Sequence, residues 1–366
     1  MKRLLAFVIT LLFAEDVWGQ AQYTVTDLGN LGGAISRSAA INNAGQVVGF
    51  SNTTGNSSYH AFLYSAGTLN DLGTLGGMDS DANGINNGGQ VVGCADDSGN
   101  NYFAYLYSNG TMQNLGTLGG PFSWANGIND GGQVVGCAYI GVFSHQQEHA
   151  FLYSGGKMQD LGTLSGGTFS QANGINNSGQ VVGDAYNSSG NDQAFLYSSG
   201  TMQDLGTLGG LYSCANAINS SGQVVGYAYN GSRAYHAFLY SGGRMQDLGT
   251  LSNSYSYESN ALSINDSGLI VGEALNNGAN DQHAFLQING TMEDLNSLIA
   301  PSSGWTLEEA DGINDAGQIA GWGYTPTGQE DAFLLTPTPE PSTIALLAAS
   351  SVGLLAFTWH RRSAKA

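Results

Sequence analysis

A motif of the form I-N-x-x-G-Q-V-V-G returns about every 45 residues along this chain. Its isoleucine occurs seven times, at steps of 43 to 49 residues: Ile41, Ile85, Ile128, Ile175, Ile218, Ile264 and Ile313. A period of about 20 to 50 residues indicates a repeat architecture, in which neighbouring copies of one small unit bury a shared core. The repeat therefore constrains the fold before any local pattern is considered.

Each repeat contains four short segments rich in Val, Ile, Phe, Tyr and Leu, with Gly, Asn and Ser between them. This composition is typical of β-strands. In chain order the segments resemble ANGIN, QVV, AFLY and MQDLG. QVV and AFLY do not alternate with polar residues, so we expect these strands to be covered on both faces. The repeats have no helical periodicity, and the sequence predicts an all-β fold.

The segment between the first two strands predicts a tight turn. Asn176 favours the first turn position because its side chain can bond the backbone two residues on. Gly179 can enter the left-handed region without a Cβ clash. A calcium loop is the rival interpretation, but most copies offer Asn or Ser where a dense set of carboxylates is needed.

The phase of the repeats predicts how the domain closes. The chain enters on a DLG-type strand, residues 23–28, and leaves on an AFLL strand, residues 332–335, so the two ends together complete one unit. A ring of four-stranded units closed by its terminal strands has this phase, and the sequence predicts a seven-bladed β-propeller over residues 22–335. The expected blades are 39–73, 82–116, 125–162, 172–206, 215–249, 261–295, and 310–335 completed by 23–29.

Charge and cysteine content exclude some functions. The formal net charge is −19, and five of the nine basic residues lie in the terminal segments described next. Such an acidic surface repels phosphate backbones, so we expect no binding to nucleic acid. The three cysteines are Cys94, Cys137 and Cys214. Repeat spacing places Cys94 and Cys137 beyond disulfide reach, which predicts free thiols.

Residues 1–21 are predicted to form a secretory signal peptide. Lys2 and Arg3 precede a ten-residue apolar segment, Leu4–Phe13, that is too short to span a bilayer. Small residues at Gly19 and Ala21 mark the expected cleavage region.

The C-terminus carries a second predicted address. Residues 336–341 form a proline-rich linker that ends in Pro339, Glu340 and Pro341. An apolar segment at 342–359 and a basic tail at 360–366, with Arg361 and Arg362, follow it. The positive flank predicts a transmembrane helix with a cytoplasmic tail.

This ending resembles the PEP-CTERM sorting signal of Gram-negative bacteria, which is also called the ice-binding protein C-terminal domain without implying ice binding. The resemblance implies export across the inner membrane, transient anchoring there, and processing by an exosortase-type enzyme. The product would be displayed on the cell surface or secreted.

The third strand resembles the HAF family of extracellular repeats. The tripeptide stands at His149–Phe151, His236–Phe238 and His283–Phe285, and Phe103, Gln193 and Asp331 replace its histidine in other copies. The resemblance implies an exported repeat protein without known chemistry.

Catalytic motifs of the GxSxG, HExxH and CxxC types are absent from the sequence. The repeated histidines, for example His60, lie in separate blades, too far apart for metal bonds of about 2 Å. We therefore expect no enzyme activity, no metal and no cofactor.

One position varies in every repeat. It follows the serine that enters the inner strand, and its occupants are Arg37, Asp81, Trp124, Gln171, Cys214, Asn260 and Glu309. Loops that vary on a rigid scaffold are where binding usually occurs. These residues form the predicted ligand face.

The sequence thus predicts an exported, non-catalytic binding or matrix module, with extracellular polysaccharide as the expected ligand. Two alternatives remain. One is a polysaccharide lyase or glycoside hydrolase that uses a carboxylate pair such as Asp81 and Glu309. The other is a purely structural surface component.

Overall fold

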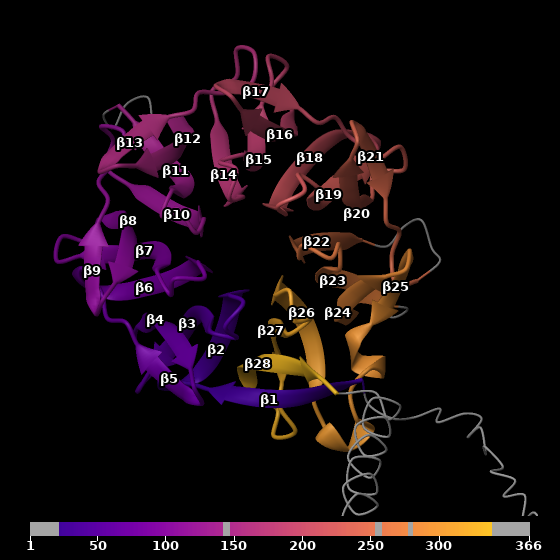
Figure 1. The fold of residues 1–366 in the computed structure, drawn as a ribbon. Coiled ribbons are helices and arrows are strands. Elements are labelled where there is room, and N and C mark those ends of the chain that lie inside the picture. Colours follow the sequence, from indigo (N-terminus) through magenta and orange to yellow (C-terminus); the bar gives the residue numbers. More distant parts are fainter. Residues whose placement is uncertain (1–21, 142–146, 253–257, 277–280, 339–366) are drawn as a thin grey trace, which may run out of the picture. The chain divides into compact units, whose positions relative to one another are not determined.

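The computed structural model describes residues 22–141, 147–252, 258–276 and 281–338. Within residues 23–337, Figure 1 shows four-stranded units arranged around a central space, with the first strand of each repeat innermost. Spatial order follows chain order inside each of the five separate four-stranded sheets, as in the sheet β10-β11-β12-β13. The ANGIN-type strand therefore lies at the inner edge and the MQD-type strand at the outer edge, as the sequence predicted.

The strands fall into four classes. The inner strands are β2 (Gly32–Ile41), β6 (Gly76–Ile85), β10 (Ser123–Ile128), β14 (Ser170–Ile175), β18 (Gly209–Ile218), β22 (Ser259–Ile264) and β26 (Thr306–Ile313). The second strands are β3 (Val47–Thr53), β7 (Val91–Asp97), β11 (Val134–Ile140), β15 (Val181–Tyr186), β19 (Val224–Asn230), β23 (Ile270–Asn276) and β27 (Ile319–Tyr324). The third strands are β4 (Tyr59–Ser65), β8 (Tyr102–Ser108), β12 (Gln147–Ser154), β16 (Asp192–Ser198), β20 (Tyr235–Ser241), β24 (Asp281–Ile288) and β28 (Glu330–Pro337). The outer strands are β5 (Thr68–Asp71), β9 (Thr111–Asn114), β13 (Lys157–Asp160), β17 (Thr201–Asp204), β21 (Arg244–Asp247), β25 (Thr291–Asp294) and β1 (Tyr23–Gly29).

Five of the sheets have four strands each, and a sixth has eight. In the larger sheet, β26-β27-β28 continues into β2-β3-β4-β5 through a single parallel bridge between Ile35 and Glu330. The first strand of the chain, β1, pairs antiparallel with the last, β28. That pairing extends to Thr336 and Pro337, which corrects the predicted start of the linker at residue 336. Pro337 is the last residue of β28, and Thr338 beyond it donates its backbone N–H to the Gln22 carbonyl.

Two ends of each unit can be distinguished by their connections. The INxxG turns between the first and second strands lie at one end, which we call the turn end. The connections between the second and third strands, and the entries into the inner strands, lie at the other, which we call the loop end. A departure from the all-strand prediction occurs between β25 and β26, where the short 3-10 helices η1 (Leu295–Ser297) and η2 (Pro301–Ser303) form. Asp294 caps η1 by accepting a hydrogen bond from the Asn296 N–H.

The hydrophobic core lies between neighbouring units. The third-strand aromatic side chains are fully buried, for example Phe62, Tyr105 and Phe151, and so are both valines of each VVG segment that carries them. One cluster joins Val135, Ala150 and Leu161 of one repeat to Ala172, Val181, Ala185 and Phe195 of the next. The cluster between the last and first repeats contains Leu28 of β1, Ala332 of β28 and Val47 of β3. Burial on both faces explains why these strands lack polar alternation.

The predicted turn is present in the structure. Asn176 closes it with two backbone bonds, and Gly179 has φ 78°, in the left-handed region. The second glycine of the motif has a different cause. A Cβ on Gly183 would overlap the Gln171 carbonyl oxygen, where β14 bulges against β15.

A closed chain of hydrogen bonds joins the turns. The motif asparagine of each repeat donates from Nδ2 to the backbone carbonyl of the equivalent asparagine in the next repeat, at 3.0 to 3.1 Å. The chain returns to its start when Asn314 donates to Asn42. Each of these asparagines is at most 5% exposed. Their Oδ1 atoms accept backbone N–H groups of their own turns, as Asn176 does from Gln180 at 3.0 Å. We call this feature the asparagine ring.

The predictions for the two termini fall outside the described residues. These are the signal peptide at 1–21, the transmembrane helix at 342–359 and the tail at 360–366. Among the residues that the structure describes, no helix has the length and apolarity needed to cross a bilayer. Cys94, Cys137 and Cys214 are buried free thiols, as predicted.

The asparagine ring generates a prediction about stability. We expect Asn176→Ala to lower the free energy of unfolding by about 2 kcal/mol, because it removes the bond to the buried Asn219 carbonyl and takes away the acceptor of two backbone N–H groups in its own turn. Its neighbour Asn177 is exposed, and Asn177→Ala should cost less. Denaturant unfolding followed by circular dichroism measures both, and equal losses would contradict the role of the ring.

A second prediction concerns the turn glycine. Gly179→Val should destabilise the domain by at least about 1 kcal/mol, because a β-branched residue resists positive φ. Gly179→Asn should cost less, since Asn tolerates this conformation. The space around Gly179 does not explain a difference, because the nearest atom to an added Cβ is Gln133 Oε1 at 3.6 Å. Similar midpoints for the two variants in thermal unfolding would show that φ is not the constraint.

Candidate ligand face

The seven predicted ligand-face residues occupy one register position on the inner strands. Each pairs with the residue that follows VVG, or its equivalent, on the second strand. The partners are Phe50, Cys94, Cys137, Asp184, Tyr227, Glu273 and Trp322. Register therefore places Asn260 and Glu309 at the same position as the other five. Six of the seven are half-buried, and Cys214 is buried.

Each of these side chains contacts residues of its own repeat or of an adjacent repeat rather than another member of the set. Arg37 binds Glu330 Oε1 at 2.5 Å and lies 3.8 Å over the Trp322 ring. Both partners belong to the last repeat of the chain. Trp124 packs against Phe122 and Tyr139 of its own repeat, with ring centroids 6.1 and 5.8 Å away.

Hydrogen bonds engage the other five members. Asp81 accepts the Cys94 N–H, and Gln171 donates to Asn173. The remaining three link neighbouring repeats, through Cys214 to Asp184, Asn216 to Asn260, and Gln282 to Glu309. Over the described ranges, no hydrogen bond, ion pair or ring contact joins two of the seven.

Buried carboxyl groups are concentrated around these positions. Burial raises the pKa of Asp192 to about 7, and the charge of Asp184 and a hydrogen bond with it add to the effect. Burial and the charge of Glu309 raise the pKa of Glu273 to about 7. Burial also raises the pKa values of further carboxyl groups: Asp81, Asp184, Glu308, Asp311 and Asp331. Two carboxyl groups in one dry site cannot both ionise cheaply, so one keeps its proton.

Sequence reasoning missed Asp184, Asp192 and Glu273 as members of this environment. The residue after VVG varies almost as strongly as its partner on the inner strand, and that second variable column was the available signal for Asp184 and Glu273, whereas Asp192 lies outside it. The structure also joins the two columns by register. Among the described residues, no group of three His, Cys, Asp or Glu side chains is arranged to hold a metal ion.

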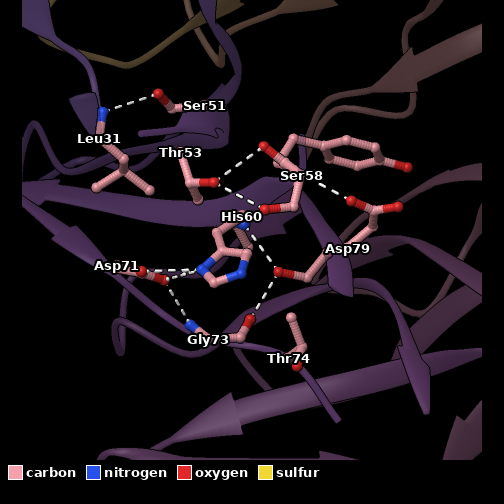
Figure 2. A network of polar contacts seen from close by, with 12 residues as sticks. Leu31, Ser51, Thr53, Ser58, His60, Asp71, Gly73, Thr74 and Asp79 are labelled. Atoms are coloured by element: carbon pink, nitrogen blue, oxygen red, sulfur yellow. Dashed lines mark hydrogen bonds and ion pairs between the residues drawn. The ribbon is translucent and has the colours of Figure 1, made fainter. Parts of the chain in front are cut away.

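The repeated histidines have a local role. In four repeats the histidine Nδ1 lies 2.6 to 3.0 Å from the aspartate that ends the outer strand: His60–Asp71, His149–Asp160, His236–Asp247 and His283–Asp294. Figure 2 shows this contact at His60, where Asp71 also accepts the Gly73 N–H. The hydrogen bond that His283 donates to Asp294, together with the charge of Asp294, raises the pKa of His283. Burial opposes ionisation of Asp294, but bonds from His283 and Asn296 give it a lowered pKa.

The turn end has a polar pocket on the axis of the repeats. It has a volume of about 200 Å³ and is lined by the Ile-Asn dipeptide of every motif and the residue that follows it. Side-chain oxygens in this layer already accept bonds from the neighbouring turn, as Asp130 does from Asn87 and Asn177. The Asp residues of this pocket therefore complete the turns, in agreement with the structural interpretation of the motif.

The titratable groups predict that the domain is more stable near about pH 5 than near about pH 8. A carboxyl group with a raised folded pKa binds more protons when folded, so its contribution is lost as pH rises from 3.8 through about 7 for Asp192. The raised pKa of His283 acts in the same direction above 6.5. The lowered pKa values of Asp97, Asp130 and Asp294 matter only at more acidic pH.

Thermal unfolding across this pH range measures the effect. Asp192→Asn should raise the midpoint at about pH 8 and flatten the pH dependence, because it removes a buried charge. Asp294→Asn is the control of opposite sign and should lower the midpoint near about pH 5, where its pair with His283 is fully formed. A domain that is more stable at the alkaline end would contradict this assignment.

Comparisons with solved structures support the fold. The chain is similar to a structure described as YCF48 bound to D1 peptide, at 12% identity and TM-score 0.54, covering 88% of this chain and 97% of that one. It is also similar to the acylaminoacyl peptidase of Pyrococcus horikoshii, at 11% identity and TM-score 0.52, covering 88% of this chain and 55% of that one. A third similar structure is the β-propeller domain of the trilobed protease from Pyrococcus furiosus, at 8% identity and TM-score 0.49, covering 70% and 82%. At these identities the likeness concerns the fold alone, and the sheets of this chain themselves show that the fold is all-β and propeller-like.

A search of curated proteins finds no match. Residues 337–362 match the PEP-CTERM protein-sorting motif, which marks the chain as exported to the surface or medium of a Gram-negative bacterium, with processing of the exosortase type. A second family model matches residues 120–336, more than half of the sequence. The chain therefore belongs to the family described as "Protein of unknown function (DUF3466)".

Proposed function

We propose that this chain is an exported seven-bladed propeller that binds extracellular polysaccharide at its loop end and catalyses no reaction. The seven blades are the five separate sheets and the two halves of the eight-stranded sheet. The asparagine ring, which passes through all seven motifs, supports both the count and the closure. The pairing of β1 with β28 supports closure of the last blade by both termini, because it leaves neither terminal strand unpaired.

The distribution of exposed apolar side chains carries the proposed function. Five large hydrophobic residues of the described chain are exposed, and every one lies at the loop end of its strand: Met78, Tyr186, Leu211, Tyr212 and Tyr324. The conserved geometry of the turns leaves the opposite end with similar polar surfaces in each repeat. Variable loops on a rigid scaffold are where binding usually occurs, and the exposed apolar side chains lie at this end. Tyrosine adds a flat apolar face and a hydroxyl, which suits sugar rings with both apolar faces and hydroxyl groups.

A propeller enzyme acting on polysaccharide remains the rival. Glu273 is the observation that favours it, since a carboxyl group with a pKa of about 7 suits general acid–base catalysis. The cavity beside Glu273 favours the binding function, because its volume of about 30 Å³ holds about one water and no sugar ring. The suggested pair of Asp81 and Glu309 also has no contact within the described ranges.

The sorting motif gives this function its location. Under the proposal, residues 342–359 anchor the precursor in the inner membrane until an exosortase-type enzyme processes it, and the propeller is then displayed or released. The HAF-repeat resemblance supports the same extracellular role and rests on the sequence alone. A purely structural surface component would share this location, and only binding distinguishes it.

The proposal is tested by native affinity electrophoresis of residues 22–338 in gels that contain the polysaccharides of its host. We expect at least one polysaccharide to retard the domain without release of reducing ends or unsaturated products. Replacing Tyr186 and Tyr324 with Ser should weaken the retardation, because both lie at the loop end. Lys157→Ser, at the turn end, is the control and should not.

Two outcomes would contradict the proposal. Retardation by no polysaccharide would favour the structural role. Release of sugar products would show that the propeller is an enzyme.

A further inference from the structure

The loop between β19 and β20 places an arginine, Arg233, at a backbone position with positive φ, where the equivalent loops have Asn or Gly. Five of the connections between second and third strands close with the same backbone hydrogen bond, at 2.9 to 3.1 Å, from the fourth residue to the first. The fourth residue has positive φ in every case: Asn56 (56°), Asn100 (60°), Gly190 (76°), Arg233 (68°) and Gly328 (78°). Asn and Gly are the residues that adopt this conformation readily, and arginine is not.

Arg233 is therefore the exception among five equivalent loops. Strained backbone of this kind costs free energy and is found where the surrounding structure or the function requires it. The loop does not need arginine for folding, since four related loops close with Asn or Gly. The surroundings of Arg233 therefore indicate the role of this arginine.

Arg233 is among the residues that line an apolar cavity of about 480 Å³. Leu211, 60% exposed, and Tyr212, 42% exposed, form its wall, and Tyr212 meets Tyr229 edge to face with centroids 5.6 Å apart. Three glycines and Asn230 complete the lining: Gly209, Gly210, Gly231 and Asn230. A cavity of about 300 to 1,000 Å³ with an apolar lining and few polar groups is typical of small-ligand sites.

Charge identifies the ligand class. Between the two terminal segments the chain has four basic residues: Arg37, Lys157, Arg233 and Arg244. Arg37 is paired with Glu330, whereas in the described structure no carboxylate lies within ion-pair distance of Arg233. Lys157 and Arg244 begin outer strands at the turn end. Among the residues that the structure describes, Arg233 is thus a loop-end cation without an ion-pair partner in a strongly acidic protein, and its planar fork matches a carboxylate.

We infer that the cavity formed by Leu211, Tyr212, Tyr229 and Arg233 binds a uronate unit, a sugar ring that carries a carboxylate, of an acidic polysaccharide. The ring lies against Tyr212 and Leu211, and Arg233 donates two hydrogen bonds to the sugar carboxylate. The acidic remainder of the surface repels polyanions, so we expect the charged units of the polymer to be held at this cavity, while other loop-end side chains contact its apolar faces. The inference deepens the proposed function and rests on it, because it names the ligand of one loop-end site.

Three polymers test the inference by isothermal titration of residues 22–338. Polygalacturonate carries both the ring and the carboxylate. Its methyl ester keeps the ring without the charge, and polyglutamate keeps the charge without the ring. We expect polygalacturonate to bind at least about tenfold more tightly than either of the others, because each lacks one of two contacts, and a charge-assisted hydrogen bond accounts for about that factor.

Arg233→Asn gives the sharpest variant, because Asn is the residue that two related loops use at this position. It should weaken binding of polygalacturonate about tenfold or more while the thermal midpoint stays unchanged or rises, because strain is relieved. Tyr212→Ala should also weaken binding. The matched control is Arg244→Gln, which removes a cation at the turn end and should not change binding.

Several results would overturn the inference. Equal binding of polygalacturonate and its ester would show that the site does not recognise the carboxylate. Equal binding of polygalacturonate and polyglutamate would show that the site does not recognise the sugar ring. Full binding by Arg233→Asn would place the site elsewhere. In these cases the domain still binds a polymer, and the ester result leaves the proposed polysaccharide function intact. If the domain binds no polysaccharide at all, the inference and the proposed function fail together.

Discussion

The rest of the structure depends on the asparagine ring. Its seven buried amides each hold their own turn and bind the turn of the next repeat, so the position of one inner strand fixes that of its neighbour. The cost of leaving such a buried group unpaired makes the arrangement cooperative around the ring. The core clusters between units act in the same way further from the axis, since no sheet buries its apolar faces alone. The hydrogen bonds near the axis and the apolar clusters further out together allow a chain with few charges and many glycines to form one stable domain.

The fixed turn end leaves the loop end free to vary. There the repeats differ in strand length, in loop sequence and in the pairs of residues that face each other across the first two strands. Some of that variation is used to connect repeats, as in the contacts of Arg37 with Trp322 and Glu330. Other variation leaves carboxyl groups such as Glu273 buried and partly protonated. The remainder exposes apolar side chains such as Leu211, and this surface gives the domain its proposed ability to bind.

Much of the fold could be predicted because the same local sequence pattern occurs seven times along the chain. The turn at Gly179, the doubly covered VVG strand and the partnership of β1 with β28 follow from residue type, lack of alternation and the phase of the repeat. The site was harder to predict. Repeat alignment located the column of Arg37 and Trp124, but it could not show that neighbours in adjacent strands would occupy these side chains, because such contacts depend on register and on the distance between sheets. The cavity at Tyr212 depends on a four-residue extension of β18 and on the φ of Arg233, and neither is visible in a single sequence pattern.

On this account the loop end binds polysaccharide and the turn end holds the repeats together. Hydrogen–deuterium exchange of residues 22–338, with and without a bound acidic polysaccharide, tests it most directly. The account predicts new protection in peptides that contain residues 209–212 and 229–234, and unchanged exchange in the INxxG turns. New protection confined to the turns, with no change at the loop end, would contradict it.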